Sequence, residues 1–213
     1  MSKAGNRGLF EQQNDERHDE IVFDLATRAD ELIAIVGGGT NTRDFKFDAG
    51  DWNHDLGLER NAIIGTVTTT VHDQWHEIEK PVRGARNFLI GFADLFIVWE
   101  EERRADVNPH LADKLKFWLD YMGYDRPNQT QRSRRAMLVE VKTGKLRPGE
   151  TLRQLKAYRP ELRPVPHRMI VAVDTPPPTS VVLGLQHEGV HTIVVEPGGH
   201  ITPLEFEPFN GAS

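Results

Sequence analysis

Two carboxylates and a lysine stand where the surrounding sequence is strongly apolar. Glu140 and Lys142 are separated by one residue inside the run 136–142, which reads Ala-Met-Leu-Val-Glu-Val-Lys. Because side chains alternate between the two faces of a β-strand, we expect both charges to point to the same side. Asp94 is the only charged residue in the run 89–99. Charges on apolar strands are costly unless they are paired or bound to a metal, so these residues predict a divalent-metal site.

Each of these side chains also has a purely structural interpretation. Asp94 could be a buried aspartate that accepts hydrogen bonds from the backbone. Glu140 and Lys142 could pair with each other on an edge strand, where charges oppose aggregation. The sequence leaves both alternatives open.

The composition limits the kind of metal site. The 213 residues include no cysteine, which excludes disulfides, thiolate zinc sites, iron–sulfur clusters and cysteine nucleophiles. Oxygen and imidazole ligands remain, and they favour Mg²⁺ or Mn²⁺. No apolar run approaches the roughly 18–20 residues that cross a bilayer, and the first residues lack the apolar segment of a signal peptide. We therefore expect a cytoplasmic protein with no membrane partner.

The net charge of −6 is unevenly distributed. Residues 1–60 carry 7 Lys/Arg and 13 Asp/Glu, whereas residues 142–168 carry 8 Lys/Arg and 2 Asp/Glu. Residues 126–135 include four arginines and no acid. A basic surface beside Glu140 could bind the phosphates of a nucleic acid, although a solvated helix face would have the same composition. The cations expected to bind nucleic acid are Lys145, Arg147, Arg153, Lys156, Arg132, Arg134 and Arg135.

Hydrophobic periodicity predicts the elements that position these residues. Apolar side chains recur at three- and four-residue steps over 14–36, as in an amphipathic helix, and 40–60 is polar and predicts a loop. Apolar runs then predict strands over 62–71, 75–82 and 87–101. The elements expected further along are a helix over 111–122, an exposed basic loop over 126–135, a strand over 136–142, a helix over 148–162, a strand over 168–174 and short strands over 180–185 and 191–196.

This order predicts an α/β fold with a mixed central sheet flanked by helices. The length suits one domain, 1–213. Its core is expected over about 14–36 and 62–196, with a helical insertion at about 100–136 between the Asp94 and Glu140 strands.

Three short motifs resemble those of the PD-(D/E)xK nuclease superfamily, especially its RecB-like exonuclease branch. Gly91-Phe92-Ala93-Asp94 resembles Gly-x-x-Asp, Glu140-Val141-Lys142 resembles (Asp/Glu)-x-Lys, and Gln154-Leu155-Lys156-Ala157-Tyr158 resembles Gln-x-x-x-Tyr. The motifs occur in the superfamily's order within residues 77–174, although Ala93 stands where the superfamily name has proline. The resemblance implies a restriction-endonuclease-like αβββαβ core and metal-dependent hydrolysis of phosphodiester bonds.

The same resemblance implies roles for individual residues. Asp94, Glu140 and the backbone carbonyl of Val141 would supply oxygen ligands to Mg²⁺ or Mn²⁺. Lys142 would aid deprotonation of the attacking water or stabilise the pentavalent anion. The resemblance therefore implies a nuclease, for which we expect DNA as the substrate ahead of RNA, while the residues themselves leave that choice open.

Residues on two helices could complete the site. Gln154 and Tyr158 are four apart, hence on one helix face, and by resemblance would orient the site and contact the nucleic-acid backbone. His18 lies on the apolar stripe of the first helix, where the RecB-like branch often has a histidine ligand. All three residues could instead be structural. Glu77 and Glu79 are further acids that could lie near the metal.

Other functions fit the same sequence. The chain could be a catalytically silent nucleic-acid-binding module of this fold, a metal-dependent phosphodiesterase for a small substrate, or an α/β interaction protein with structural acids. The insertion at 100–136 could shape a strand-binding groove or a homodimer interface.

Overall fold

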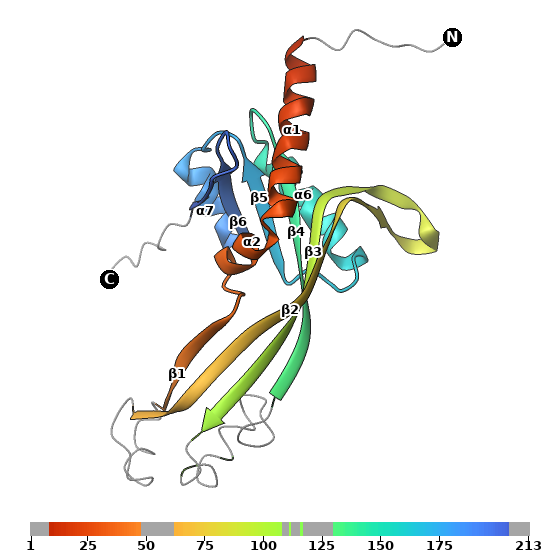
Figure 1. The fold of residues 1–213 in the computed structure, drawn as a ribbon. Coiled ribbons are helices and arrows are strands. Elements are labelled where there is room, and N and C mark those ends of the chain that lie inside the picture. The colour runs from red at the N-terminus through yellow and green to blue at the C-terminus, as the bar shows by residue number, and fades with distance from the viewer. Residues whose placement is uncertain (1–8, 48–61, 108–110, 112–115, 117–129, 205–213) are drawn as a thin grey trace, which may run out of the picture. The chain divides into compact units, whose positions relative to one another are not determined.

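The computed structural model describes residues 9–47, 62–107, 111, 116 and 130–204 (Figure 1). The helices are α1 (Leu9–Thr27), α2 (Ala29–Ile35), α6 (Pro148–Tyr158) and α7 (Thr179–His187), with short 3-10 helices η1 (Ala85–Asn87) and η2 (Arg159–Glu161). The strands are β1 (Asn41–Phe47), β2 (Ala62–Arg83), β3 (Leu89–Val107), β4 (Thr130–Lys142), β5 (Arg168–Val173), β6 (Val190–Val195) and β7 (Ile201–Leu204).

The chain forms two compact units, which we describe separately. The α/β unit comprises Met1–Gly37, Trp75–Val98 and Arg135–Ser213, and the strand unit comprises Gly38–Gln74 and Trp99–Arg134. Strands β2, β3 and β4 each contribute residues to both units. All residues of the predicted metal site belong to the α/β unit.

The strands form a mixed sheet in the order β1-β2-β3-β4-β5-β6-β7. In the α/β unit, β4, β5 and β6 are parallel and β7 is antiparallel to β6. In the register of β4 and β5, Glu140 is opposite Val171 and Lys142 is opposite Val173. The predicted α/β class with a mixed sheet flanked by helices is therefore confirmed.

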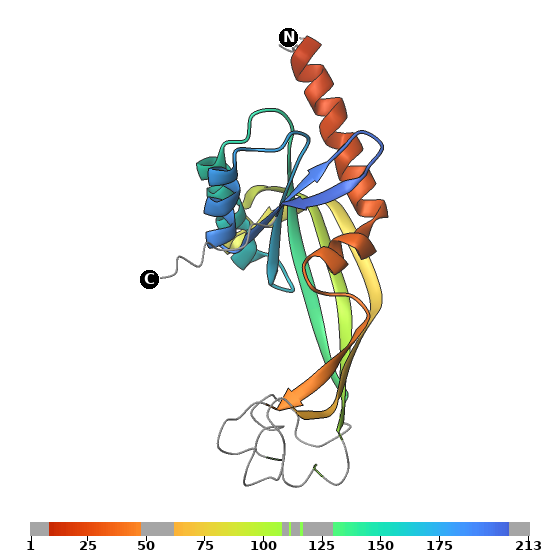
Figure 2. The same ribbon diagram turned by 90° about the vertical axis from the view of Figure 1, so that its left-hand side faces the viewer.

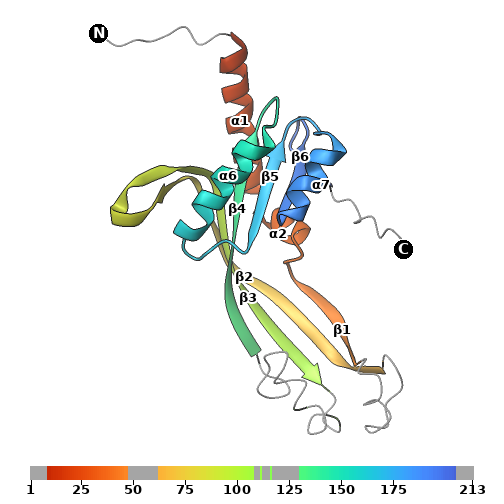
Figure 3. The same cartoon turned by 180° about the vertical axis from the view of Figure 1, so that it is seen from behind.

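Helices cover both faces of the parallel strands. Figures 2 and 3 show α6 and α7 on one face of β4, β5 and β6, and α1 and α2 on the other. Because both faces are covered, Ala136 to Val141 are all buried, as expected for a parallel strand inside an α/β layer. Glu140 is thereby carried into the protein interior.

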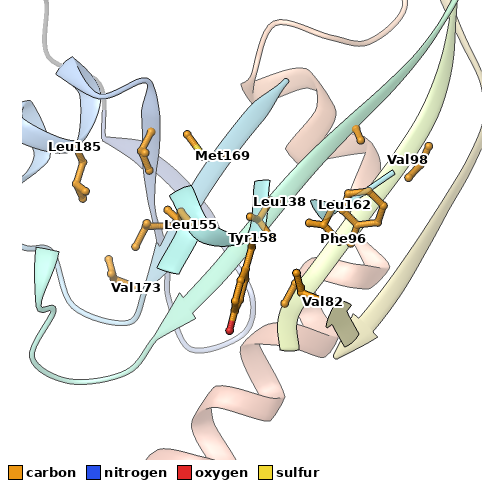
Figure 4. Close-up of a cluster of buried hydrophobic side chains, with 14 of the residues drawn as sticks. Val82, Phe96, Val98, Leu138, Leu155, Tyr158, Leu162, Met169, Val173 and Leu185 are labelled. Atoms are coloured by element: carbon orange, nitrogen blue, oxygen red, sulfur yellow. The ribbon is translucent and has the colours of Figure 1, made fainter. Parts of the chain in front are cut away.

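The core beneath α6 and α7 is a continuous apolar cluster within the α/β unit. Figure 4 shows Leu155 and Tyr158 of α6 packed over Leu138 of β4, with Phe96 of β3 and Leu185 of α7 in the same cluster. Leu155 and Tyr158 are three residues apart, so they lie on one face of the helix. Burial of that face holds α6 against the strands that carry the acids.

Several predicted elements were wrong. The helix expected over 14–36 is two helices, with Arg28 between them. The loop expected over 40–60 contains β1, and the two strands expected over 62–71 and 75–82 are one strand, β2. The short apolar run at 180–185 is the helix α7 rather than a strand. The physical reason is topological, because the neighbouring parallel strands β5 and β6 require a crossover connection.

The predicted insertion at 100–136 was wrong at both ends. Strand β3 continues to Val107 and β4 begins at Thr130, so the basic segment that includes Arg132, Arg134 and Arg135 is strand rather than exposed loop. The arginines belong to a half-exposed strand, in which opposite charges on neighbouring strands can pair. Most of the helix expected over 111–122 lies outside the described residues.

Candidate active site

Four elements of the α/β unit bring the predicted site residues together. Helix α1 carries His18, β3 carries Asp94, β4 carries Glu140 to Lys142, and α6 carries Gln154 and Tyr158. Two sets of polar contacts link these side chains, one around Asp94 and one around Glu140. The tertiary structure thus assembles residues that are far apart in the chain.

The carboxylate of Asp94 joins β3 to both β4 and α1. Its Oδ2 accepts a hydrogen bond of 2.7 Å from the backbone N–H of Val141 and lies 3.4 Å from Nε2 of His18. The N–H and C=O of one strand residue point to the same side, so the carbonyl of Val141 also faces this edge of β4. The structural alternative for Asp94 is therefore partly realised, because the side chain does accept a backbone hydrogen bond.

The carboxyl group of Glu140 is the most deeply buried charge of the site. The residue is 1% exposed, and Oε1 accepts a hydrogen bond of 2.6 Å from Nζ of Lys142. Its Oε2 is buried with no hydrogen-bond partner. The pKa of Glu140 is raised to about 7, mainly by burial and also by the negative charge of Asp94, while Lys142 and Gln154 oppose the shift.

Lys142 connects Glu140 to helix α6. Its Nζ also donates a 3.3 Å hydrogen bond to Oε1 of Gln154, whose Nε2 donates at 3.3 Å to the hydroxyl of Tyr158. The Lys142 side chain is 30% exposed, so solvent reaches it while Glu140 stays covered. Gln154 thus contacts the lysine directly, and Tyr158 contacts Gln154.

Gly91 explains how Tyr158 reaches this network. A Cβ atom at position 91 would overlap with the hydroxyl oxygen of Tyr158 and would lie 2.9 Å from its Cζ. Any larger residue would push the tyrosine ring away from β3. The glycine of the first motif and the tyrosine of the third are thus required by one packing contact.

His18 faces the site from the other side of the sheet. Its hydrogen bond to Asp94 is the main cause that raises the pKa of the imidazole to about 9, and the charge of Asp94 and contacts with Asp19 add to the shift. Nδ1 of His18 lies 3.2 Å from Oδ1 of Asp19. Partial burial acts in the opposite direction. In this arrangement His18 pairs with the carboxylate that is the candidate metal ligand.

The donor set fits a hard divalent cation. Among the described residues, no group of three or more His, Asp or Glu side chains is arranged to hold a metal ion. Asp94 and Glu140 nevertheless provide two carboxylates, and the buried Oε2 of Glu140 lacks a partner that a cation could supply. Mg²⁺ is often held by one or two carboxylates with water in its remaining positions, so two acids are sufficient.

The predicted nucleic-acid-binding cations lie in two places. In the α/β unit, Lys145 is exposed, while Arg147 pairs with Glu150 at 3.5 Å and Lys156 with Glu188 at 2.7 Å. These pairs partly neutralise the basic face that the composition suggested.

The other predicted cations lie on α6 and β4. Arg153 is exposed and its Nε donates to the carbonyl of Gly149 at 3.2 Å, and Arg135 is half-buried on β4. Arg132 and Arg134 belong to the strand unit, where Arg132 pairs with Glu102 at 2.8 Å. Five of the seven predicted cations thus belong to the α/β unit and two to the strand unit.

Three further acids of the α/β unit are Glu77 and Glu79, which the sequence suggested, and Asp174. Glu77 and Glu79 are exposed, and Glu77 pairs with Lys80 at 2.5 Å. Asp174, which the sequence did not single out, accepts hydrogen bonds of 3.1 and 3.2 Å from the N–H of Gly144 and so ties down the loop after β4. Its position directly after β5 was the available signal, because parallel strands end at one edge of a sheet.

Comparison with protein-family models, curated proteins and solved structures finds no match for this chain. Within the described residues, no helix combines the length and apolar character needed to cross a membrane.

Proposed function

We propose that the protein is a divalent-metal-dependent nuclease that hydrolyses phosphodiester bonds of DNA, built on a restriction-endonuclease-like core. The observation that carries this proposal is Glu140. Its carboxyl group is buried near the carboxylate of Asp94. Its Oε1 accepts a hydrogen bond from Lys142, and its Oε2 has no hydrogen-bond partner. A buried polar atom without a partner is costly, and a cation bound between Glu140 and Asp94 would remove that cost.

The metal and the protein would divide the chemistry. A divalent cation held by Asp94, Glu140 and the carbonyl of Val141 would lower the pKa of a bound water and stabilise charge on the phosphate. The 2.7 Å hydrogen bond from Val141 fixes the orientation of the Asp94 carboxylate. His18 contacts the same Asp94 carboxylate that would hold the metal. If His18 loses its proton when the metal binds, it would be a further ligand, and if it keeps its proton, it would be a counter-ion of Asp94.

Lys142 would act on the reacting phosphate. Its Nζ donates to both Glu140 and Gln154, and these two hydrogen bonds would hold it where it can stabilise developing negative charge. Gln154 and Tyr158 would be positioning residues, because their hydrogen bonds hold the lysine near the buried acid.

A substrate panel tests the proposal directly. Labelled single- and double-stranded DNA and RNA are incubated with Mg²⁺, Mn²⁺ or EDTA, using the wild type and Lys142→Met. We expect metal-dependent cleavage of DNA, lowered by roughly 10²-fold or more in Lys142→Met because a charge-stabilising donor is lost. Lys80→Met is the matched control, since Lys80 is also half-buried and paired with a glutamate, and it should cleave at nearly the wild-type rate.

The panel also separates the rival functions. Undiminished cleavage by Lys142→Met, or cleavage in EDTA, contradicts the mechanism. DNA binding without cleavage in any metal indicates a binding module, and hydrolysis of bis(p-nitrophenyl) phosphate alone indicates a phosphodiesterase for small substrates. Cleavage of RNA alone would reassign the substrate.

A further inference from the structure

The hairpin between β2 and β3 exposes aromatic side chains next to the candidate site. Within the α/β unit it extends to one side of the parallel strands, with Gly91 against α6 and Gly84 beside η2 (Figures 1 and 3). Phe88 is 74% exposed and Phe92 is 52% exposed, and Ile90 between them is also exposed. Exposing several large apolar residues on one short segment is costly in water and usually marks a binding surface.

The exposed apolar side chains continue from the turn onto β3. Ile90 and Phe92 alternate along β3, so they point away from the face on which Gly91 contacts Tyr158, and Phe88 lies directly before the strand. Phe92 precedes Asp94 by two residues, a distance of ~7 Å along a strand. A base stacked on Phe92 would therefore belong to a nucleotide close to a phosphate at Asp94.

The turn that presents these rings is held in place and is basic. The N–H of Gly84 donates to the carbonyl of Phe88 at 2.9 Å, and Nη1 of Arg83 donates to the carbonyl of Asn87 at 3.2 Å. Residues 80–92 contain Lys80, Arg83 and Arg86 and no acid. Lys80 pairs with Glu77, and Glu161 of η2 lies beside Gly84, so the positive charge is concentrated in the two arginines.

We propose that this hairpin is a stacking platform for unpaired nucleobases, which selects single-stranded DNA or the unpaired end of a duplex. Surfaces that bind single-stranded nucleic acid combine aromatic rings with cations, because bases stack on the rings while the arginines neutralise phosphates. Bases inside a duplex are already stacked and cannot use the platform. A symmetric contact with a second copy would set the basic turns against each other, which disfavours that occupant. The inference rests on the proposed nuclease function in placing the cleaved phosphate at Asp94.

Binding without cleavage tests the platform. Fluorescence anisotropy with labelled oligothymidylate, and with a blunt duplex, is measured in EDTA for the wild type and for Phe88→Ala/Phe92→Ala. The double variant should bind the single strand about tenfold or more weakly, with a smaller change for the duplex. Phe23→Ala is the matched control, because Phe23 on α1 is 65% exposed and lies outside the hairpin. It should bind as the wild type does.

Two further variants define what the platform recognises. Phe88→Leu/Phe92→Leu keeps an apolar surface but removes the flat rings, so it should also lose binding. Arg86→Gln should reduce the slope of log affinity against log salt by about one. Since all of these side chains are exposed, thermal melts should match that of the wild type.

The outcomes separate this inference from the proposed function. Wild-type single-strand binding by the double alanine variant overturns the platform, even if DNA is still cleaved. Ring-dependent binding with no cleavage of any substrate supports the platform and overturns the nuclease. A wild-type dimer that the double variant converts to a monomer, seen by light scattering, overturns the platform and assigns the hairpin to self-association.

Discussion

Two buried glutamates make different use of similar local sequences. Glu101 on β3 in the strand unit is followed two residues later by Arg103, just as Glu140 on β4 is followed by Lys142. The two glutamates are 2% and 1% exposed. Both carboxylates accept a hydrogen bond from the cation two residues on. Sequence pattern and burial alone therefore do not distinguish them.

Their remaining partners do distinguish them. Oε2 of Glu101 accepts from Arg103 at 3.1 Å and Oε1 accepts from Nε1 of Trp99 at 3.2 Å, so both oxygens are satisfied. Glu140 has one unsatisfied oxygen and lies within the field of Asp94. A fully bonded buried carboxylate stabilises a fold, whereas a half-bonded one beside a second acid has capacity left for a ligand. The comparison thus separates a structural acid from a candidate metal ligand.

The largest difference is expected in activity. Glu140→Gln should lower metal-dependent DNA cleavage by at least about 10²-fold, because the neutral amide cannot anchor the cation. Glu101→Gln should keep activity within a few-fold of the wild type, since its partners lie outside the site. Single-turnover cleavage rates at saturating Mg²⁺ measure both variants. Equal losses in the two variants would remove the functional distinction.

Added metal should raise the melting temperature of Glu101→Gln but not that of Glu140→Gln. At a Mn²⁺ concentration about 100 times Kd, the wild type and Glu101→Gln should melt about 5–10 °C higher than in EDTA. Glu140→Gln should show little or no shift, because one of the two carboxylates is gone. Differential scanning fluorimetry gives the values. A full shift in Glu140→Gln would place the metal elsewhere.

In the absence of metal, the order of stability should reverse. Glu101→Gln should lower the free energy of unfolding by about 1–3 kcal/mol, since two buried hydrogen bonds lose a charged acceptor. Glu140→Gln should leave the free energy unchanged or raise it, because it removes a buried charge next to Asp94. Urea titrations in EDTA provide both numbers. Strong destabilisation by Glu140→Gln would favour the structural interpretation of that residue.

The smallest expected difference is in pH dependence. The folded-state pKa of Glu140 is raised from 4.5 to about 7, so folded protein binds this proton more tightly and stability is lost as pH rises between these values. His18, raised from 6.5 to about 9, extends the decline to higher pH. Metal-free Glu140→Gln should therefore lose less stability than Glu101→Gln between about pH 5 and pH 7. If the free energy of unfolding changes equally with pH in the two variants, the raised pKa of Glu140 is refuted.

Local sequence was enough to place part of the site. The strand containing Glu140 and Lys142, the strand containing Asp94 and the helix containing Gln154 all appear where periodicity predicts them. Periodicity failed at 180–185, where a short apolar run fits a strand or a buried helix equally well. It also failed at Arg132, because a polar strand with one exposed face resembles a loop in composition.

The sequence by itself determined that an acid and a lysine share one strand face, because side-chain alternation is a local property of the backbone. It also determined that cysteine-based chemistry is absent. Only the tertiary structure decided that Asp94 meets both His18 and the N–H of Val141, and that one oxygen of Glu140 has no partner. Those facts depend on how closely distant segments approach, which burial of the apolar faces of α1 and α6 controls and no short pattern encodes.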